Sequence, residues 1–201
     1  STKASSWYKG TAKPLLDSGI PLLGTLGNHD SSKDYLKYIF SKYGQKSWNF
    51  RKTIGNTRFI AVNTQKPSLS YTTDRLKEAQ ADPNLVWIIP YMHKALYTPA
   101  GSHHPAEVSQ KYHTLFTQYP KVKLVLQAHN HNYFRMKPRD GITYVQVGTG
   151  GRTPYNDAVD ANTEVHISPV FGVLKCQTSS SAISCQFVDN SGAVRDSFSV
   201  S

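Results

Sequence analysis

Side chains that can bind metal ions follow three separate apolar runs of the sequence. The runs cover residues 20–26, 85–89 and 122–126. The polar residues that follow them are Asn28, His29 and Asp30, then His93, and then His129 and His131. In open α/β sheets, ligands bind beyond the carboxyl ends of strands, and imidazole nitrogens, amide oxygens and carboxylates suit Zn, Mn or Fe. If the three runs are strands, their ends form a candidate metal site.

Each part of this pattern has a second interpretation when it is taken alone. Gly27-Asn28-His29-Asp30 can be a strand-to-helix loop in which Asp30 or Ser31 caps the helix that follows. A single histidine at a strand end is more often an ordinary hydrogen-bonding residue, and we interpret His113 and His166 in this way. Several ligand-type groups at the same end of three strands favour the metal site.

The hydrophobic pattern predicts the elements that position these residues. Amphipathic spacing predicts helices over 7–17, 34–43, 70–81 and 105–118, with Thr72 or Thr73 as a cap of the third. Apolar or alternating runs predict strands over 22–26, 85–89, 122–126 and 142–147, a hairpin from 48–51 and 57–63, and final strands near 170–177, 183–189 and 193–200. A loop rich in Asn, Asp and Thr is predicted before the final strands.

Composition restricts the class of protein. The 201 residues are enough for one sizeable domain, and 38% hydrophobic with 18% charged residues is typical of a globular chain. No apolar run approaches the roughly 20 residues of a membrane span. The net charge of +10 favours an anionic ligand, but the basic residues are spread thinly, so we expect no specific nucleic-acid binding.

Two cysteines, Cys176 and Cys185, lie in β-patterned segments on either side of a small polar turn. Hairpin partners can reach disulfide distance, and the chain has no other cysteine. A disulfide is favoured over two reduced, buried cysteines. It predicts an extracellular or cell-surface location, as for a secreted protein.

The same blocks resemble a known family. Gly-Asn-His-Asp, a strand that ends in His93, and a strand that ends in Ala-His-x-His resemble the later blocks of the calcineurin-like metallophosphoesterases. The runs 87–89, 124–135 and 145–151 resemble the purple acid phosphatase branch. The resemblance implies an α/β fold, a metallophosphoesterase-type β-sandwich flanked by helices. A partial domain over 1–168 would be completed by C-terminal antiparallel strands over 169–201.

The resemblance also implies roles for individual residues. Asn28, His93 and His129 would bind one metal ion, and His131 would bind a second. His29 would contact the substrate phosphate or the leaving oxygen, with Asp30 orienting its ring. Two ions of the Fe, Zn or Mn class would activate a hydroxide that hydrolyses a phosphomonoester or phosphodiester substrate.

Three further residues are weaker candidates for substrate binding. The pair His103-His104 resembles the paired histidines that face the substrate in plant-type purple acid phosphatases, and Arg152 follows a Gly-rich strand end. An exposed loop pair without a role accounts for the two histidines equally well. For Arg152, an ordinary surface arginine is the commoner case.

The chain departs from the family pattern at its front. The family begins with Asp-x-His and Gly-Asp blocks, which supply the remaining ligands, and neither block occurs here. We therefore expect an N-terminal segment, from the same gene or another chain, that completes the fold. Smaller departures are Ala128 in place of Gly and Lys94 after the ligand histidine. The alternative function is a non-catalytic extracellular binding or structural protein with a degenerate metal site.

Overall fold

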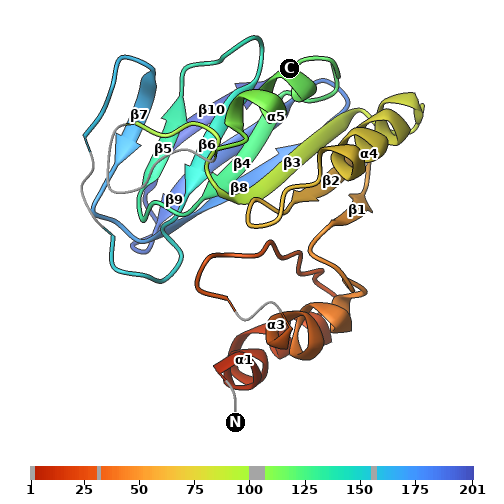
Figure 1. Ribbon diagram of the computed structural model, residues 1–201. Helices are drawn as coiled ribbons and strands as arrows, with labels where there is room; N and C mark the ends of the chain where they lie inside the picture. Colours follow the sequence, from red (N-terminus) through yellow and green to blue (C-terminus); the bar gives the residue numbers. More distant parts are fainter. Residues whose placement is uncertain (1–2, 31–32, 100–106, 155–157) are drawn as a thin grey trace.

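Two β-sheets packed face to face form the centre of the computed structural model, which describes residues 3–30, 33–99, 107–154 and 158–201. The strands of the larger sheet are β1 (Phe50–Ile54), β2 (Thr57–Val62), β3 (Trp87–Lys94), β4 (Leu124–Ala128), β5 (Tyr133–Met136), β6 (Thr143–Val147) and β7 (Thr163–Ile167). Their order in the sheet is β1-β2-β3-β4-β6-β5-β7 (Figure 1). β2, β3, β4 and β6 are parallel to one another, so their carboxyl ends meet at one edge.

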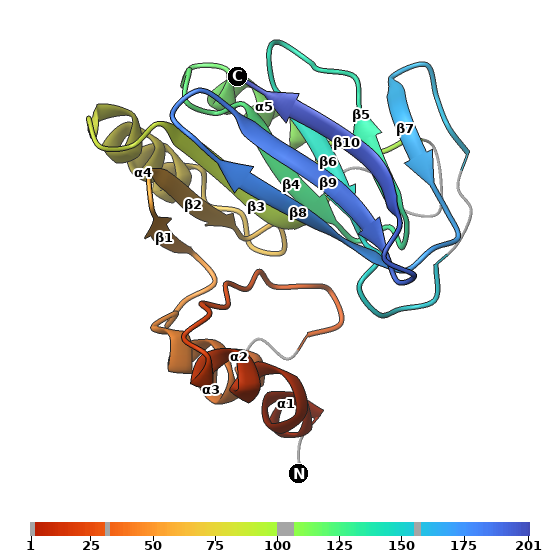
Figure 2. The same cartoon turned by 180° about the vertical axis from the view of Figure 1, so that it is seen from behind.

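The smaller sheet contains β8 (Gly172–Thr178), β9 (Ile183–Asp189) and β10 (Val194–Val200), in the order β10-β9-β8. It covers one face of the larger sheet, as Figure 2 shows from behind. Phe187 of β9 stacks on Tyr133 of β5, with ring centroids 4.1 Å apart. Cys176 and Cys185 lie directly opposite each other in the β8–β9 register and form a disulfide. The predicted α/β sandwich, its C-terminal antiparallel strands and the disulfide are confirmed.

Helices α4 (Leu69–Ala81) and α5 (Ser109–Phe116) cover the other face of the larger sheet (Figure 1). Ile88 of β3 packs under these helices, whereas its neighbour Ile89 packs between the two sheets. A strand that is covered on both faces needs apolar side chains at successive positions, which explains the apolar run 85–89. The N-cap of α4 is Ser68, whose hydroxyl accepts a hydrogen bond from the Tyr71 N–H, so the predicted threonine cap is wrong.

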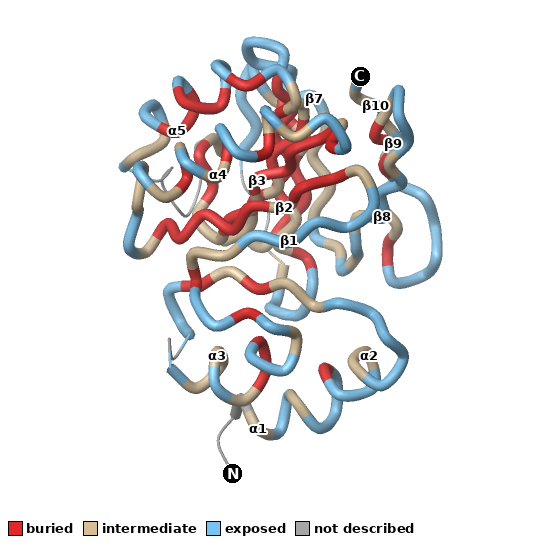
Figure 3. The backbone as a smooth tube through the Cα atoms, turned by 90° about the vertical axis from the view of Figure 1, so that its right-hand side faces the viewer, coloured by how far each residue is buried: buried red, intermediate tan, exposed pale blue. Residues whose placement is uncertain are grey.

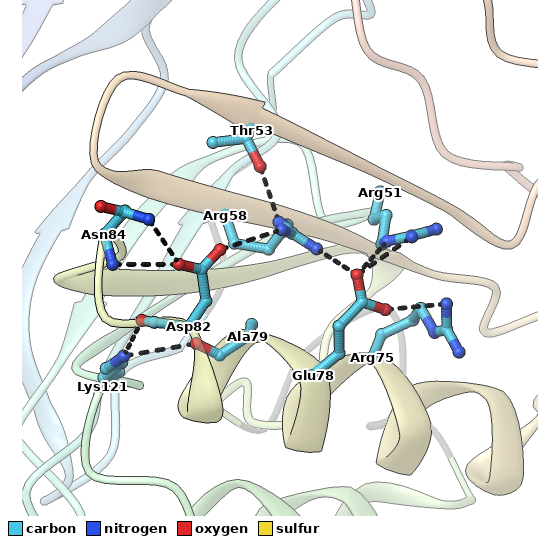
Figure 4. A network of polar contacts seen from close by, with 9 residues as sticks. All are labelled: Arg51, Thr53, Arg58, Arg75, Glu78, Ala79, Asp82, Asn84 and Lys121. Carbon is cyan, nitrogen blue, oxygen red and sulfur yellow. Dashed lines mark hydrogen bonds and ion pairs between the residues drawn. The ribbon is translucent and has the colours of Figure 1, made fainter.

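A polar network joins the β1–β2 hairpin to α4 (Figure 4). The Glu78 carboxylate accepts from the guanidinium groups of Arg51, Arg58 and Arg75 at 2.9–3.1 Å. Partial burial alone would raise the pKa of Glu78, but hydrogen bonds from Arg58 and Arg51 lower it overall. The ionised carboxylate therefore holds the edge hairpin on the helix.

The N-terminal part has a small core of its own, separate from the core along the sheets (Figure 3). Its helices are α1 (Lys3–Trp7), the π-helix η1 (Tyr8–Ala12), α2 (Lys13–Asp17), α3 (Asp34–Tyr38) and the 3-10 helix η2 (Phe40–Tyr43). Phe40 and Trp48 meet edge to face in this core, with ring centroids 5.5 Å apart. The two helices predicted over 7–17 and 34–43 are therefore confirmed in position, although both are irregular.

The predicted strand over 22–26 is wrong, because the segment forms no strand among the described residues. The side chain of Gln45 forms the two hydrogen bonds to the Gly24 backbone that a neighbouring strand would otherwise form. Its Oε1 accepts from the Gly24 N–H at 3.0 Å, and its Nε2 donates to the Gly24 carbonyl at 2.9 Å. Gly24 also packs against Phe40 so closely that a Cβ would lie 2.2 Å from its ring.

Other differences concern the ends of elements. β3 continues through Pro90 to Lys94, so His93 lies inside the strand rather than after it. β5 and β7 were not predicted as strands; β7 lies where the loop before the final strands was expected. α5 begins at Ser109, later than the predicted helix start at 105. Within the described residues, no helix is both long and apolar enough to cross a membrane.

Gln45→Ala tests whether the Gln45 side chain holds the N-terminal part. Gln45 is fully buried, and its loss leaves both backbone groups of Gly24 without that partner. We expect the free energy of unfolding to fall by about 2–3 kcal/mol. Urea unfolding measures this. The control is Gln118→Ala, which removes an exposed amide bonded to Thr114 and should change stability by less than ~0.5 kcal/mol. Equal effects of the two variants would contradict the assignment.

Asp189 closes the turn between β9 and β10. Its carboxylate accepts from the Ser191 hydroxyl at 2.6 Å, from the Ala193 N–H at 3.1 Å and from Arg195 at 3.0 Å. These hydrogen bonds, above all that from Ser191, lower the pKa of Asp189 to about 2. An aspartate in an unfolded chain has a pKa of about 3.9. The ionised group therefore stabilises the fold above pH ~4, and this stabilisation is lost as the pH falls toward 2.

Asp189→Asn should therefore be less stable than the parent at neutral pH. The difference should shrink as the pH falls from about 4 to about 2, because both proteins then carry a neutral side chain at this position. Thermal unfolding between pH 7 and pH 2 measures the difference. Asp74→Asn, an exposed charge change on α4, is the control and should alter stability by less than ~0.5 kcal/mol at pH 7. A difference that does not depend on pH would contradict the role of the carboxylate.

Candidate metal centre

The pairing of β3 with β4 brings two of the predicted metal ligands together. His93 lies near the end of β3, and His129 directly follows β4. The parallel register pairs Tyr91 with Leu126 and Lys94 with Ala128, and it shifts between the two pairs. Such irregularities re-aim side chains beside functional sites. Here His93 Nε2 and His129 Nδ1 lie 3.0 Å apart, with the rings edge to face.

Asn28 reaches the same point from the N-terminal part. Its Oδ1 lies 2.8 Å from His93 Nε2. Gly27 permits this approach, because a Cβ there would lie 3.2 Å from the His93 ring and 2.8 Å from the Asp30 carboxylate. Asn28 Oδ1 and His129 Nδ1 therefore both lie next to His93 Nε2, and we call these three atoms the donor cluster.

Burial lowers the pKa of the His93 imidazole below its ordinary value. The neighbouring carboxylate of Asp30 opposes this effect, while His29, Lys94 and His131 add to it. The net direction favours the neutral ring, which is the form that can donate a lone pair to a metal ion.

The backbone at His129 has a left-handed conformation, with φ of 79°. Among the described non-glycine residues only Asp140 shares a positive φ, whereas Ala128 does not. Such a conformation costs a residue with a Cβ of order 1 kcal/mol or more, and it is found mainly where function requires it. It turns the chain sharply after β4 and directs the His129 ring toward His93. Ala128 is thus compatible with the position usually held by Gly.

Buried amide side chains fix the loops around the donor cluster. Gln127 Oε1 accepts from the Leu96 N–H at 2.9 Å, and its Nε2 donates to the Tyr97 carbonyl. Asn130 Nδ2 donates to the Thr98 hydroxyl at 2.6 Å. These bonds tie the segment after β3 to the end of β4 and to the residue after His129, so they fix the chain next to both histidines.

The end of β6 packs under the same loop. Gln146 Nε2 donates to Asn132 Oδ1 at 2.5 Å, and the Gly148 N–H donates to the Asn132 carbonyl at 3.0 Å. A Cβ at Gly148 would lie 1.7 Å from the Asn130 carbonyl oxygen, so only glycine fits there. The four amides Gln127, Asn130, Asn132 and Gln146 were not predicted as part of the site. In the sequence they can be recognised only as polar residues that lie within or next to apolar strands.

The remaining candidates lie in different surroundings. His131 and His29 are close enough to His93 to affect its pKa. The Asp30 carboxylate accepts from the Gly27 N–H at 2.7 Å. Arg152 lies on an exposed turn after β6, and His103 and His104 lie outside the described residues. His113 is bonded to the Tyr144 hydroxyl and to Asp140, and His166 stacks on Phe134, as expected of ordinary histidines.

The donor cluster fits one metal ion. Two imidazole nitrogens and an amide oxygen suit Zn, Mn or Fe, and three protein donors leave positions open. Within the described ranges, no three His, Cys, Asp or Glu side chains converge on a common metal position. The cluster therefore supplies neutral donors only, and its third member is the amide of Asn28.

Substitutions of His129 separate backbone strain from metal binding. Glycine adopts a φ of 79° without strain, whereas alanine does not. We expect His129→Gly to be more stable than His129→Ala by about 1 kcal/mol. Both variants should lose binding of Mn²⁺ or Zn²⁺ in isothermal titration calorimetry. Equal stabilities would contradict the left-handed backbone, and metal binding by both variants would contradict the donor role.

The fold is similar to three solved structures. GAP50, the anchor in the inner membrane complex of Plasmodium, has a TM-score of 0.71 at 15% identity, over 90% of this chain and 66% of that chain. A dimetal phosphatase from Danio rerio has a TM-score of 0.61 at 10% identity, over 98% and 77%. PhoD has a TM-score of 0.51 at 8% identity, over 75% and 41%. The chain thus spans just under two thirds of GAP50 and less than half of PhoD.

The curated proteins contain no match to the chain. The family model for calcineurin-like phosphoesterases, in contrast, matches residues 2–133. This match covers more than half of the 201 residues and includes every member of the donor cluster. The chain therefore belongs to the calcineurin-like phosphoesterase family.

Proposed function

We propose that the chain is the C-terminal part of a metal-dependent phosphoesterase domain, similar to the purple acid phosphatase branch, that hydrolyses phosphomonoesters or phosphodiesters. The observation that carries the proposal is that Asn28 Oδ1 and His129 Nδ1 lie 2.8 Å and 3.0 Å from His93 Nε2. These residues would hold one ion, and His131 would contribute to a second in the complete domain. Residues 1–168 and 169–201 would belong to one domain, because the smaller sheet shares a core with the larger one.

The ions, when bound, supply positive charge and Lewis acidity toward the phosphate ester. The chain's own side chains would orient the centre, bind the phosphate and transfer the proton. Neutral His93 and His129 would orient the centre, and exposed His29 would hydrogen-bond the phosphate or give a proton to the leaving oxygen. Asp30, which is anchored to the Gly27 N–H, would keep negative charge beside the imidazoles. The net charge of +10 favours approach of an anionic ester.

The remaining ligands would come from a segment that this sequence does not include, from the same gene or from another chain. The support is twofold: the sequence has no Asp-x-His or Gly-Asp block, and the structural neighbours are longer than this chain. The Cys176–Cys185 disulfide supports an extracellular or cell-surface location.

A second candidate function is a non-catalytic binding or structural protein. It is favoured by the likeness to GAP50, which is described as an anchor, and by the lack of carboxylates in the donor cluster. Metal content and hydrolysis distinguish the two candidates.

His93→Ala tests the proposed function. The variant removes the central atom of the donor cluster, and we expect kcat/KM to fall by at least about 100-fold, with loss of bound metal. The assays are hydrolysis of p-nitrophenyl phosphate and of bis-p-nitrophenyl phosphate, and metal analysis of the isolated protein. His166→Ala, outside the donor cluster, is the control and should retain metal and activity. A parent protein without metal, and no more active than His93→Ala, would support the non-catalytic candidate instead.

A further inference from the structure

A cavity of about 230 Å³ lies between three segments that are far apart in the sequence, and we call it the β5–β6 pocket. The segments are the one after β3, the end of β5 with the turn that follows it, and the turn before β7. Their lining residues are 97–98, 136–139, Asp160 and Asn162. Two of these residues, Lys137 and Arg139, are basic, so the pocket has a cationic wall.

This cationic wall lies at the opposite edge of the larger sheet from the donor cluster. β5 is antiparallel to β6 and pairs Tyr133 with Val147 and Arg135 with Val145, so it runs from the carboxyl end of β6 back toward its start. The turn after β5 is therefore about 13 Å along β6 from the edge at which the parallel strands end. The cationic wall thus belongs to a site other than the candidate metal centre.

A tight turn fixes the position of Arg139. Asp140 and Gly141 have φ of 48° and 77°, as in the two-residue Asp-Gly turns that close hairpins. The Arg139 N–H donates to the Ile142 carbonyl at 2.9 Å, and the Ile142 N–H donates to the Arg139 carbonyl at 3.0 Å. The Asp140 carboxylate lies 2.7 Å from His113 Nε2, which ties the turn to α5 (Figure 1). Arg139 is therefore attached to backbone that is held from two sides.

The side chain of Arg139 is oriented by an aromatic ring. Its guanidinium lies over the ring of Tyr97, 4.6 Å from the centroid. Tyr97 in turn meets Tyr144 and His113 edge to face, and both of these are buried, so the ring is held in place. Stacking occupies the face of a guanidinium and leaves the N–H groups at its rim available. Over the described ranges, no carboxylate lies within ion-pair distance of Arg139.

Two further side chains of the β5–β6 pocket have hydrogen-bond donors to offer. The Thr98 hydroxyl accepts from Asn130 Nδ2 at 2.6 Å, so its own proton is available for another partner. Lys137 Nζ donates to the Ala161 carbonyl at 2.9 Å, which uses one of the three protons of the ammonium group. Together with Arg139, these residues supply donors from two of the three segments around the pocket.

The acidic residue of the β5–β6 pocket is already committed to its own turn. The Asp160 carboxylate accepts from the Asn162 N–H at 2.9 Å and from the Thr163 hydroxyl at 3.0 Å. It therefore stabilises the turn before β7 rather than pairing with Lys137 or Arg139. The pocket thus combines two cations and unused donors with an acceptor that is occupied, which favours an anionic ligand.

We propose that the β5–β6 pocket binds a small phosphate, either inorganic phosphate or the phosphoryl group of a small organic monoester, through Arg139, Lys137 and Thr98. A guanidinium can pair with two phosphate oxygens, and a tetrahedral dianion has further oxygens for an ammonium and a hydroxyl group. A carboxylate has two oxygens in one plane and a single charge, so it matches fewer of these donors. This site is additional to the proposed function, which concerns the metal centre alone.

Titration of the metal-free protein with inorganic phosphate tests the proposal. The protein is kept in a chelator at constant ionic strength, and two-dimensional NMR follows its amide and arginine N–H groups. We expect saturable shifts, with a Kd of about 1 mM or lower. They should be largest at Thr98, Lys137 and Arg139, including Arg139 Nε–H. The absence of saturable shifts at these residues would overturn the proposal.

Three variants separate the stacked guanidinium from the net charge. Arg139→Gln should raise the Kd for phosphate at least about 10-fold, because charged hydrogen bonds are lost. Arg139→Lys keeps the charge but not the planar N–H groups, so its Kd should be intermediate. Lys52→Gln makes the same charge change as Arg139→Gln at an exposed position of β1, near the other edge of the sheet, and should alter the Kd by less than ~2-fold. Equal effects of Arg139→Gln and Lys52→Gln would contradict the assignment.

Other ligands and one further variant identify what is bound and where. Acetate should bind more weakly than phosphate, and equal affinity would overturn the phosphate assignment. Glycerol phosphate that binds more tightly than inorganic phosphate would support an organic monoester as the ligand, and weaker binding would support the free ion. His93→Ala should bind phosphate as the parent does, since His93 does not line the pocket. Loss of phosphate binding in His93→Ala would assign the anion to the metal centre and overturn the proposal.

Discussion

The parallel pairing of β3 with β4 is the constraint on which the candidate site depends. It sets His93 beside His129, and the shift of register between Tyr91 and Lys94 aims the two rings at each other. β3 and β4 can hold this register because they are covered on both faces. Ile88 and Val125 pack under the helices, and Ile89 and Leu124 pack between the sheets. A side chain added to or removed from either core would therefore move the imidazoles as well.

The strands that carry the histidines could be predicted from the sequence because they are apolar at nearly every position. A short apolar run between turn residues is typical of a strand that is covered on both faces. The run 22–26 is also largely apolar, yet it forms no strand. Its polar backbone at Gly24 is satisfied by Gln45, which lies 21 residues away in sequence. Hydropathy indicates that a segment is buried, but it does not indicate which groups accept its hydrogen bonds.

The positions of His93 and His129 in the candidate site could be predicted in the same way, but the support around them could not. Gln127, Asn130, Asn132 and Gln146 are polar residues that the apolar pattern treats as interruptions. Their bonds to backbone groups and to one another depend on the positions of three different strands. The left-handed backbone of His129 has no signal in the sequence either, because nothing in the residue type requires it.

The donor cluster is uncharged, whereas the chain as a whole is strongly basic. Asn28, His93 and His129 are neutral donors, and the Asp30 carboxylate is bonded to the Gly27 N–H. An ion held by these donors alone would add its full charge to a chain that already carries +10. The Asp30 carboxylate, which lies close enough to His93 to affect its pKa, would offset part of that charge.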